Sequence, residues 1–317
     1  MADNQQLWVT DSLGGYLANT KLSKQLRYAA QPLMKFRQFV QVKEALGANK
    51  NDTIYFDKLS NINTAGGTLV ETDTIPENAF TVDKGTLVVT EFGNSIPYSG
   101  KLDALAEFDI DNAVTRILRD DMAKVLDAYC ADYWKLCELK WTGQGTGSYC
   151  LETCSDGTST QTGDGDVFPD DCYKIVSELK INNVPKYDGE NYICIASVNY
   201  IADMKLGADW TDAAKYGDPG RLFSGEVGRF AGVRFIEENN YLGNTQGTTS
   251  LGGEAFYFGA DAIMEAVTIP EEMRAKVPGD YGRSKGVAWY ALLGFSKIWD
   301  VANDGQPKII HHNPVVP

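Results

Sequence analysis

Apolar residues recur at a helical period from Leu102 to Lys140, the longest patterned segment of the chain. Their spacing of three and four positions continues without a glycine or proline, and it predicts one helix over 103–140. A helix of these 38 residues would be roughly 57 Å long. A compact globule of the whole chain would be about 50 Å across. The pattern therefore predicts an elongated molecule with this helix as its spine. If the helix is broken, we expect the break near 119–121, where the apolar stripe is weakest.

A polar segment with a β pattern precedes the predicted helix, between residues 51 and 99. It has no helical period, and polar linkers with glycine and proline separate three short extended runs, at 53–56, 80–82 and 86–90. A β segment this polar has little apolar surface to bury by itself. We therefore expect it to project from the body of the molecule and to find its partner surface on another subunit.

The sequence after the predicted helix alternates between helical and extended patterns. Residues 142–171 contain six glycines, six acids and no Lys or Arg, which is typical of an acidic surface loop. Helices are then predicted over 172–180 and 199–205, and strands over 192–196, 225–236, 255–259, 267–269 and 286–295. This alternation indicates an α/β or α+β unit.

Charge is unevenly distributed along the chain, which has a net charge of -14. Residues 1–47 carry six basic and three acidic groups, a net of +3, so the remainder carries -17. The overall balance argues against a general nucleic-acid binder, because phosphate neutralisation requires clustered Lys and Arg. No run of about 18 apolar residues and no secretory signal pattern is present, so we expect a soluble protein that is not secreted, with its first 47 residues acting as a basic arm.

Catalytic and metal-binding patterns are sparse. The only histidines, His311 and His312, are adjacent, which leaves no spaced zinc pair and no separated catalytic histidine. The glycines of 143–147 follow a helix pattern, the wrong order for a dinucleotide turn. Four consecutive acid pairs point to different faces of their elements and are interpreted as solvated surface: Asp120/Asp121, Asp170/Asp171, Glu237/Glu238 and Glu271/Glu272.

Two weak metal candidates remain. Asp156, Asp164 and Asp166 lie in a glycine-rich segment and offer the oxygen ligands that calcium prefers, although their spacing matches no EF-hand. Cys150 and Cys154 would be half of a metal site, but no second close pair of Cys or His accompanies them. We therefore expect no cofactor, free thiols, and a protein that is not an enzyme.

Several segments together resemble the major capsid (coat) proteins of tailed bacteriophages. They are Gln31-Pro32-Leu33, Gly67–Glu71 with Ile75-Pro76, Thr90–Tyr98, and Gly228–Val233, set in the order arm, β segment, long helix, α/β unit and returning strand. The resemblance implies an α+β, Hong Kong 97-like phage capsid fold, which encapsulins and herpesvirus floor domains share. Its parts would be an N-terminal arm (1–47), an extended β loop (48–100), a peripheral domain with the spine helix (101–141 and 263–317), an acidic surface loop (142–171) and an α/β axial domain (172–262).

The resemblance also implies a function. The chain would self-assemble into pentamers and hexamers that form the icosahedral shell around double-stranded phage DNA, in the virion and after assembly in the host bacterial cytoplasm. It implies further partners: a portal protein, a separate scaffolding protein, a decoration protein and non-specific contact with packaged DNA, with no membrane. The candidate subunit contacts are Lys21, Lys24, Arg27, Phe36, Phe39, Tyr55, Lys58, Glu71, Lys84 and Arg283. The alternatives are an encapsulin-type nanocompartment shell and a virion decoration or receptor-binding protein.

Overall fold

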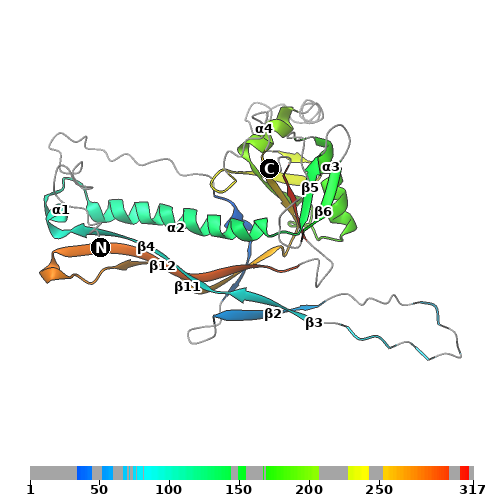
Figure 1. Cartoon of the computed structure of the whole chain (residues 1–317), viewed down its shortest axis with the longest axis horizontal. Coiled ribbons are helices and arrows are strands. Elements are labelled where there is room, and N and C mark those ends of the chain that lie inside the picture. The colour runs from blue at the N-terminus through cyan, green and yellow to red at the C-terminus, as the bar shows by residue number, and fades with distance from the viewer. Residues whose placement is uncertain are drawn as a thin grey trace.

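The computed structural model describes residues 34–44, 52–59, 67–69, 71, 74–75, 77–80, 82–143, 149–154, 167, 169–206, 228–242, 253–299 and 308–313. Figure 1 shows an elongated unit, a compact unit at one end of it, and a projecting β hairpin. The helical segments are η2 (Phe36–Phe39), α1 (Gly100–Leu105), α2 (Ile110–Lys135), α3 (Pro169–Ile181), α4 (Val198–Leu206) and η3 (Asp280–Gly282). The strands are β1 (Gln41–Glu44), β2 (Thr53–Leu59), β3 (Val82–Val88), β4 (Thr90–Ser99), β5 (Leu139–Gly143), β6 (Tyr149–Thr153), β7 (Tyr192–Ser197), β8 (Arg229–Phe230), β9 (Val233–Glu238), β10 (Ala255–Phe258), β11 (Ile263–Ala275), β12 (Ser284–Lys297) and β13 (Ile309–His312).

The elongated unit consists of α2 lying along a four-stranded sheet with the order β1-β11-β12-β4 (Figure 1). Strand β12 is antiparallel to both β11 and β4, while β1 adds in parallel at the other edge of β11. Every second residue of β12 from Trp289 to Phe295 faces α2 and is buried, as the period of a strand requires. The long apolar run that predicted a strand at 286–295 is therefore confirmed.

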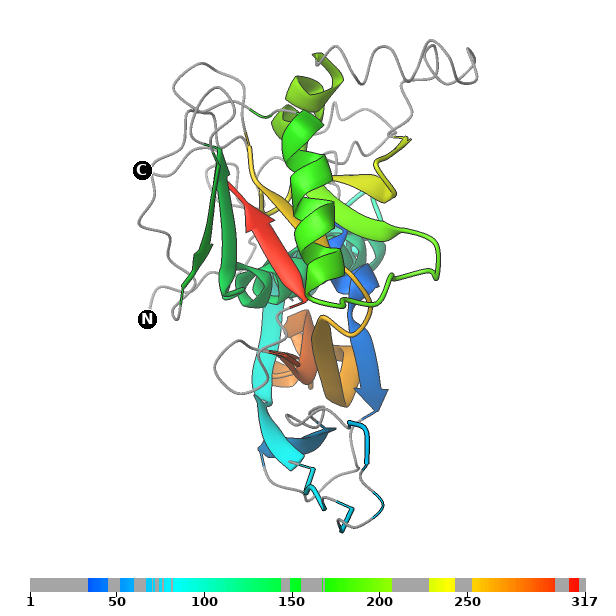
Figure 2. The ribbon, with the colours of Figure 1, turned by 90° about the vertical axis from the view of Figure 1, so that its right-hand side faces the viewer.

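The compact unit contains a seven-stranded mixed sheet with the order β6-β5-β13-β10-β7-β9-β8. Helices α3 and α4 pack on one of its faces, and Figure 2 shows α3 lying across the strands. The opposite face meets the C-terminal part of α2. All six residues of β7 are buried because both faces of this strand are covered. The helices predicted at 172–180 and 199–205 and the buried strand at 192–196 are confirmed.

The predicted continuous helix over 103–140 is wrong at both ends. Helix α1 ends at Leu105 because Ala106 adopts an extended conformation, and α2 begins at Ile110 after Asp109, whose carboxylate accepts a hydrogen bond from the Asn112 N–H. The chain therefore bends at 106–109, whereas it stays helical through 119–121. The 26 residues of α2 span about 39 Å, shorter than the predicted rod but still more than twice the average helix.

The C-terminal end of the predicted helix is a strand. Residues 139–143 form β5 because they pair with β13 on one side and β6 on the other. Strand β6 lies inside the segment predicted as an acidic loop, so 149–153 is part of the sheet. Strands β5 and β13 belong to the compact unit, although the predicted division assigned residues 139–141 of β5 and all of β13 to the peripheral domain.

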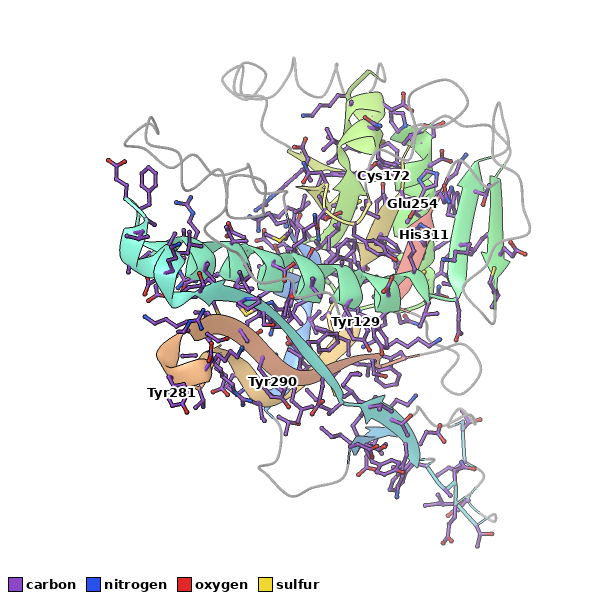
Figure 3. All side chains as sticks on the ribbon, turned by 60° about the vertical axis from the view of Figure 1, so that its left-hand side comes forward. Tyr129, Cys172, Glu254, Tyr281, Tyr290 and His311 are labelled. Atoms are coloured by element: carbon purple, nitrogen blue, oxygen red, sulfur yellow. The ribbon has the colours of Figure 1, made fainter. Side chains whose placement is uncertain are left out.

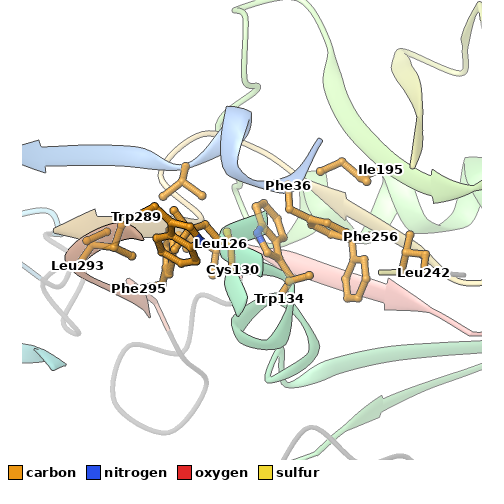
Figure 4. Close-up of a cluster of buried hydrophobic side chains, with 14 of the residues drawn as sticks. Phe36, Leu126, Cys130, Trp134, Ile195, Leu242, Phe256, Trp289, Leu293 and Phe295 are labelled. Carbon is orange, nitrogen blue, oxygen red and sulfur yellow. The ribbon is translucent and has the colours of Figure 1, made fainter. Parts of the chain in front are cut away.

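A single hydrophobic cluster joins the two units (Figure 4). Trp134 of α2 is fully buried, with its ring 4.4 Å from that of Phe258 and 6.0 Å from that of Phe36. Phe256 completes the contact, with its ring 5.7 Å from that of Phe36. Because η2, the end of α2 and β10 share these rings, this cluster spans the junction of the two units, while a second cluster lies between the seven-stranded sheet and α3 and α4.

The β2–β3 hairpin forms a separate two-stranded sheet and lies on the face of the four-stranded sheet that is opposite α2. Phe56 and Leu87 are buried against Met264 and Ala266 of β11. The hairpin crosses β12 closely at Gly294, where any Cβ would overlap the Val88 carbonyl oxygen. In the described residues these contacts attach the hairpin to the body, and Figure 1 shows it projecting from there, as the polar β pattern predicted.

Candidate assembly surfaces

The hairpin and the segment beyond it expose large apolar side chains. The fraction of each side chain that is exposed ranges from 48% to 69% for Tyr55, Leu59, Leu69, Ile75, Phe80, Val82 and Val88. An isolated two-stranded hairpin is marginally stable in water and buries little of such surface. Apolar patches of this kind mark interaction sites in soluble proteins, so this hairpin is the first candidate assembly surface.

Exposed apolar residues of α2 are a second candidate surface. Ile117 and Val125 of α2, Leu136 at its C-cap and Leu105 of α1 are exposed. The buried stripe of α2 includes Val114, Leu118, Leu126, Cys130 and Trp134. The exposed residues are single apolar positions among charges, which makes this surface weaker than the hairpin as an interaction site.

Arg37 anchors η2 in the described end of the predicted arm. Its guanidinium donates to Glu265 at 2.9 and 2.6 Å and pairs with Glu271, while its backbone N–H donates to Asp127 at 3.1 Å. Burial lowers the pKa of Arg37, but the hydrogen bonds and negative charge of Glu265 and Glu271 outweigh it, and the pKa is raised. Glu265 is only 2% exposed, so Arg37 compensates a buried carboxylate.

The candidate contact residues fall into three groups. Tyr55, Glu71, Lys84 and Arg283 are exposed. Phe36 and Lys58 are buried within the chain, and Phe39 is half-buried with its ring 5.8 Å from that of Phe258. Phe36 therefore serves the internal core in this structure and not an open contact surface. Lys21, Lys24 and Arg27 lie outside the described residues.

Each of the four acid pairs has one member that makes contacts inside the protein. In each pair one member turns inward: Asp121 accepts hydrogen bonds from Trp289 and Asn94, Asp171 accepts one from Trp141, Glu238 accepts three backbone N–H groups of 240–242, and Glu271 pairs with Arg37. The two acids of a pair do point to different faces of their element, as predicted. The prediction that both acids are solvated is wrong. No residue type in the sequence signals which member is buried.

The two histidines occupy a buried polar cluster that sequence reasoning missed. His311 receives a contact of 2.8 Å from Lys140 Nζ and lies 3.3 Å from Glu254, and its ring stacks on Phe256. Burial lowers the pKa of His311 to about 4, despite the opposing charge of Glu254. Because Lys140 donates to a neutral imidazole, the cluster is a structural link between β5, β13 and β10.

His312 faces the other side of the same sheet. Its Nδ1 lies 2.6 Å from the Tyr200 hydroxyl, which in turn lies 2.8 Å from the Tyr257 hydroxyl. Burial and the neighbouring His311 lower the pKa of His312 to about 3. Burial also raises the pKa of Cys172 to about 12 and raises the pKa values of Cys130, Cys137 and Cys194. Thiols held in the protonated form in this way are poor nucleophiles.

Ligand-binding chemistry finds little support in the described part of the chain. There, no three side chains of His, Cys, Asp or Glu come together as a metal site requires. The calcium candidates Asp156, Asp164 and Asp166 and the Cys150 side chain fall outside the described residues. Among the helices that the structure describes, none has both the length and the apolar composition needed to cross a bilayer.

The sequence matches no protein-family model and no curated protein, whereas the structure has many relatives. A chain in the capsid structure of the cyanophage P-SCSP1u has a TM-score of 0.68 at 12% identity, covering 93% of this chain and 92% of that one. A chain in the capsid of Ralstonia phage GP4 has a TM-score of 0.66 at 16% identity, covering 98% and 99%. A chain in the cyanophage Pam1 capsid asymmetric unit has 0.61 at 12% identity and covers 100% of both. The protein therefore has, over nearly its whole length, the mixed α+β fold found in chains of phage capsids.

Proposed function

We propose that this chain is a major capsid protein, the structural subunit of a phage capsid shell. The observation that supports it most is the structural similarity to chains of phage capsids, which covers more than nine-tenths of this chain and of each compared chain. The apolar residues exposed on the hairpin support it independently, since they give a shell subunit a surface to place on its neighbour. The role is structural and non-enzymatic, and its place is the virion shell.

The finer proposal is a Hong Kong 97-like subunit that forms pentamers and hexamers around double-stranded DNA. The elongated unit (α2 with its sheet) would be the peripheral domain, and the compact unit (seven-stranded sheet, α3 and α4) the axial domain. Interfaces of about 1,000 Å² or more each, repeated by symmetry, would hold the shell. A portal protein, a scaffolding protein and a decoration protein would be further partners, and assembly would take place in the host bacterial cytoplasm.

The basic arm and the acidic segment would lie on opposite surfaces of this shell. The net charge of +3 over residues 1–47 suits contact with packaged DNA or with an acidic neighbour. Residues 142–171 carry six acids and would face outward, because packaged DNA repels them at short range.

Electron microscopy and sedimentation of the purified protein test the proposal. We expect closed particles of uniform size from the full chain. Replacement of residues 60–80 by a short Gly-Ser linker should abolish particles, because it removes Leu69, Ile75 and Phe80. Deletion of residues 1–25 should also block assembly and leave a folded monomer, and normal particles from that deletion would refute the arm's role.

Other outcomes would favour the alternatives. A stable trimer without large particles would indicate a decoration or receptor-binding protein. Particles that co-purify with a cargo enzyme after expression in their native host would indicate an encapsulin-type shell.

A further inference from the structure

The turn between β11 and β12 projects an aromatic side chain from the far end of the elongated unit (Figure 3). Tyr281 is fully exposed, and it lies between Asp280 and Gly282, all three with positive φ. The turn is held by backbone hydrogen bonds: the Arg283 N–H donates to the Asp280 carbonyl at 3.0 Å, and the Gly100 N–H donates to the Arg283 carbonyl at 2.8 Å. Left-handed conformations are unfavourable for bulky residues, so this turn displays its ring from a fixed and unusual backbone.

A cavity of about 580 Å³ that is open to the surface lies at the opposite end of the same strands, where the hairpin meets the four-stranded sheet. Phe56, Met264 and Ile298 are buried and give it an apolar lining, while Asp57 and Asp261 line it with carboxylates. Its volume is in the range of pockets that enclose small ligands, about 300–1,000 Å³. One aromatic side chain and its flanking backbone fit such a space.

The exposed ring and the cavity are too far apart to meet within one chain. The cavity includes Met264 at the start of β11, whereas Tyr281 follows the end of that strand. The 13 residues of β11 span about 40 Å. A contact between the two must therefore join two copies head to tail, the kind of contact that closes into a ring or a shell when the rotation between copies is suitable.

We propose that Tyr281 of one copy inserts into this cavity on a second copy. The ring would cover the apolar lining, and Arg283, which is 82% exposed, would lie against Asp57 at the rim. On the receiving copy, Lys58 also lines the cavity. On the inserting copy, Asp280 lies 3.3 Å from Arg283 and would come to the same rim with it. Buried aromatic anchors flanked by charges are the usual centres of binding energy at interfaces. The inference rests on the proposed function, because it requires copies of the chain to associate.

Truncation of the ring tests the energetic part of the proposal. Tyr281→Ala should raise the concentration needed for assembly about thirtyfold, the effect of losing one interface anchor, while Tyr281→Phe stays close to the wild type. Tyr173→Ala is the matched control, because Tyr173 is a half-exposed tyrosine on α3. Circular dichroism and thermal unfolding of each unassembled variant verify that it is folded.

Crosslinking tests the position of the contact. Tyr281→Cys and Leu59→Cys proteins, mixed at equal concentration with a short bis-maleimide, should give a covalent dimer, because Leu59 lines the cavity. Neither protein alone should, and neither should a mixture of Tyr281→Cys with Tyr173→Cys.

Each result has a definite meaning. Wild-type assembly by Tyr281→Ala, or equal crosslinking in the Tyr173→Cys mixture, would overturn the inference and leave the shell function standing. Failure of the wild type to form particles would refute the shell function, and the mixed crosslink would then still decide whether two copies dock in this way. A small molecule that fills the cavity without changing assembly would show that the cavity is a ligand site and would also overturn the inference.

Discussion

Replacement of Arg37 by Met should destabilise the folded chain. Met keeps most of the apolar stem but removes the guanidinium, which leaves Glu265, 2% exposed, without its cationic partner. Stranding a buried charge costs about 3–5 kcal/mol. Because the Arg37 side chain is 29% exposed, water screens part of this effect, and we expect a loss of about 2–3 kcal/mol. For a chain of 317 residues this is a decrease in Tm of about 3–5 °C.

A double-mutant cycle distinguishes the stranded charge from lost packing. Arg37→Met combined with Glu265→Leu should be more stable than Arg37→Met alone, since the second change removes the uncompensated carboxylate. Lys285→Met is the control, because its pair with Asp103 at 2.7 Å is more exposed, and it should not change Tm measurably. Urea unfolding of the unassembled protein provides the free energies. Equal stability of wild type and Arg37→Met, or additive effects in the cycle, would refute the reasoning.

Three further predictions concern the sheet, the helix and the hairpin. The pKa values of His311 and His312 are lowered to about 4 and about 3, so the neutral histidines stabilise the fold fully above their unfolded pKa near 6.5, and this stabilisation is lost as pH falls towards 3. The loss is on the order of 3 kcal/mol per histidine. In the variant with Gln at both positions, the free energy of unfolding should therefore change less with pH. Asp109→Ala should cost about 1 kcal/mol by removing the cap of α2, whereas Asp109→Asn should cost only a few tenths, both by urea unfolding. Gly294→Ala should displace the hairpin at Val88, detectable as faster amide exchange in β3 and as impaired assembly, and unchanged exchange would contradict the close approach.

Local patterns predicted a helix or strand correctly where the burial of its apolar residues determines its structure. The run from Gly286 to Phe295 is a strand whose alternate residues, from Trp289 to Phe295, face α2 and are buried, and the periodic segment over 110–135 is helical because one stripe faces the sheet. The helix boundary at 106–109 was missed for a physical reason. Ala106 has a high helix propensity, and the cap formed by Asp109 is one acid among many in this part of the sequence.

Long-range pairing explains the remaining errors. Leu139 and Lys140 continue the helical pattern of the sequence, but pairing with β6 and β13 makes them part of a strand. The contact between Lys140 and His311 joins residues 171 positions apart, and no local pattern indicates such a partner. Three inward members of the acid pairs follow the same rule, because Asp121, Asp171 and Glu271 find their partners on distant elements, whereas Glu238 accepts from the backbone that follows it.

The distribution of apolar residues separates folding from assembly in this chain. The continuous cluster around Trp134 and Phe256 stabilises both units as one body, so the subunit does not need a neighbour to bury its core. Many of the exposed apolar residues instead lie on the hairpin, on α2 and at Tyr281, none of which closes that core. A change such as Phe80→Ser should therefore weaken assembly with little effect on the unfolding free energy of the monomer. A change in the Trp134 cluster should lower both, because the surfaces that meet neighbours are positioned by the core beneath them.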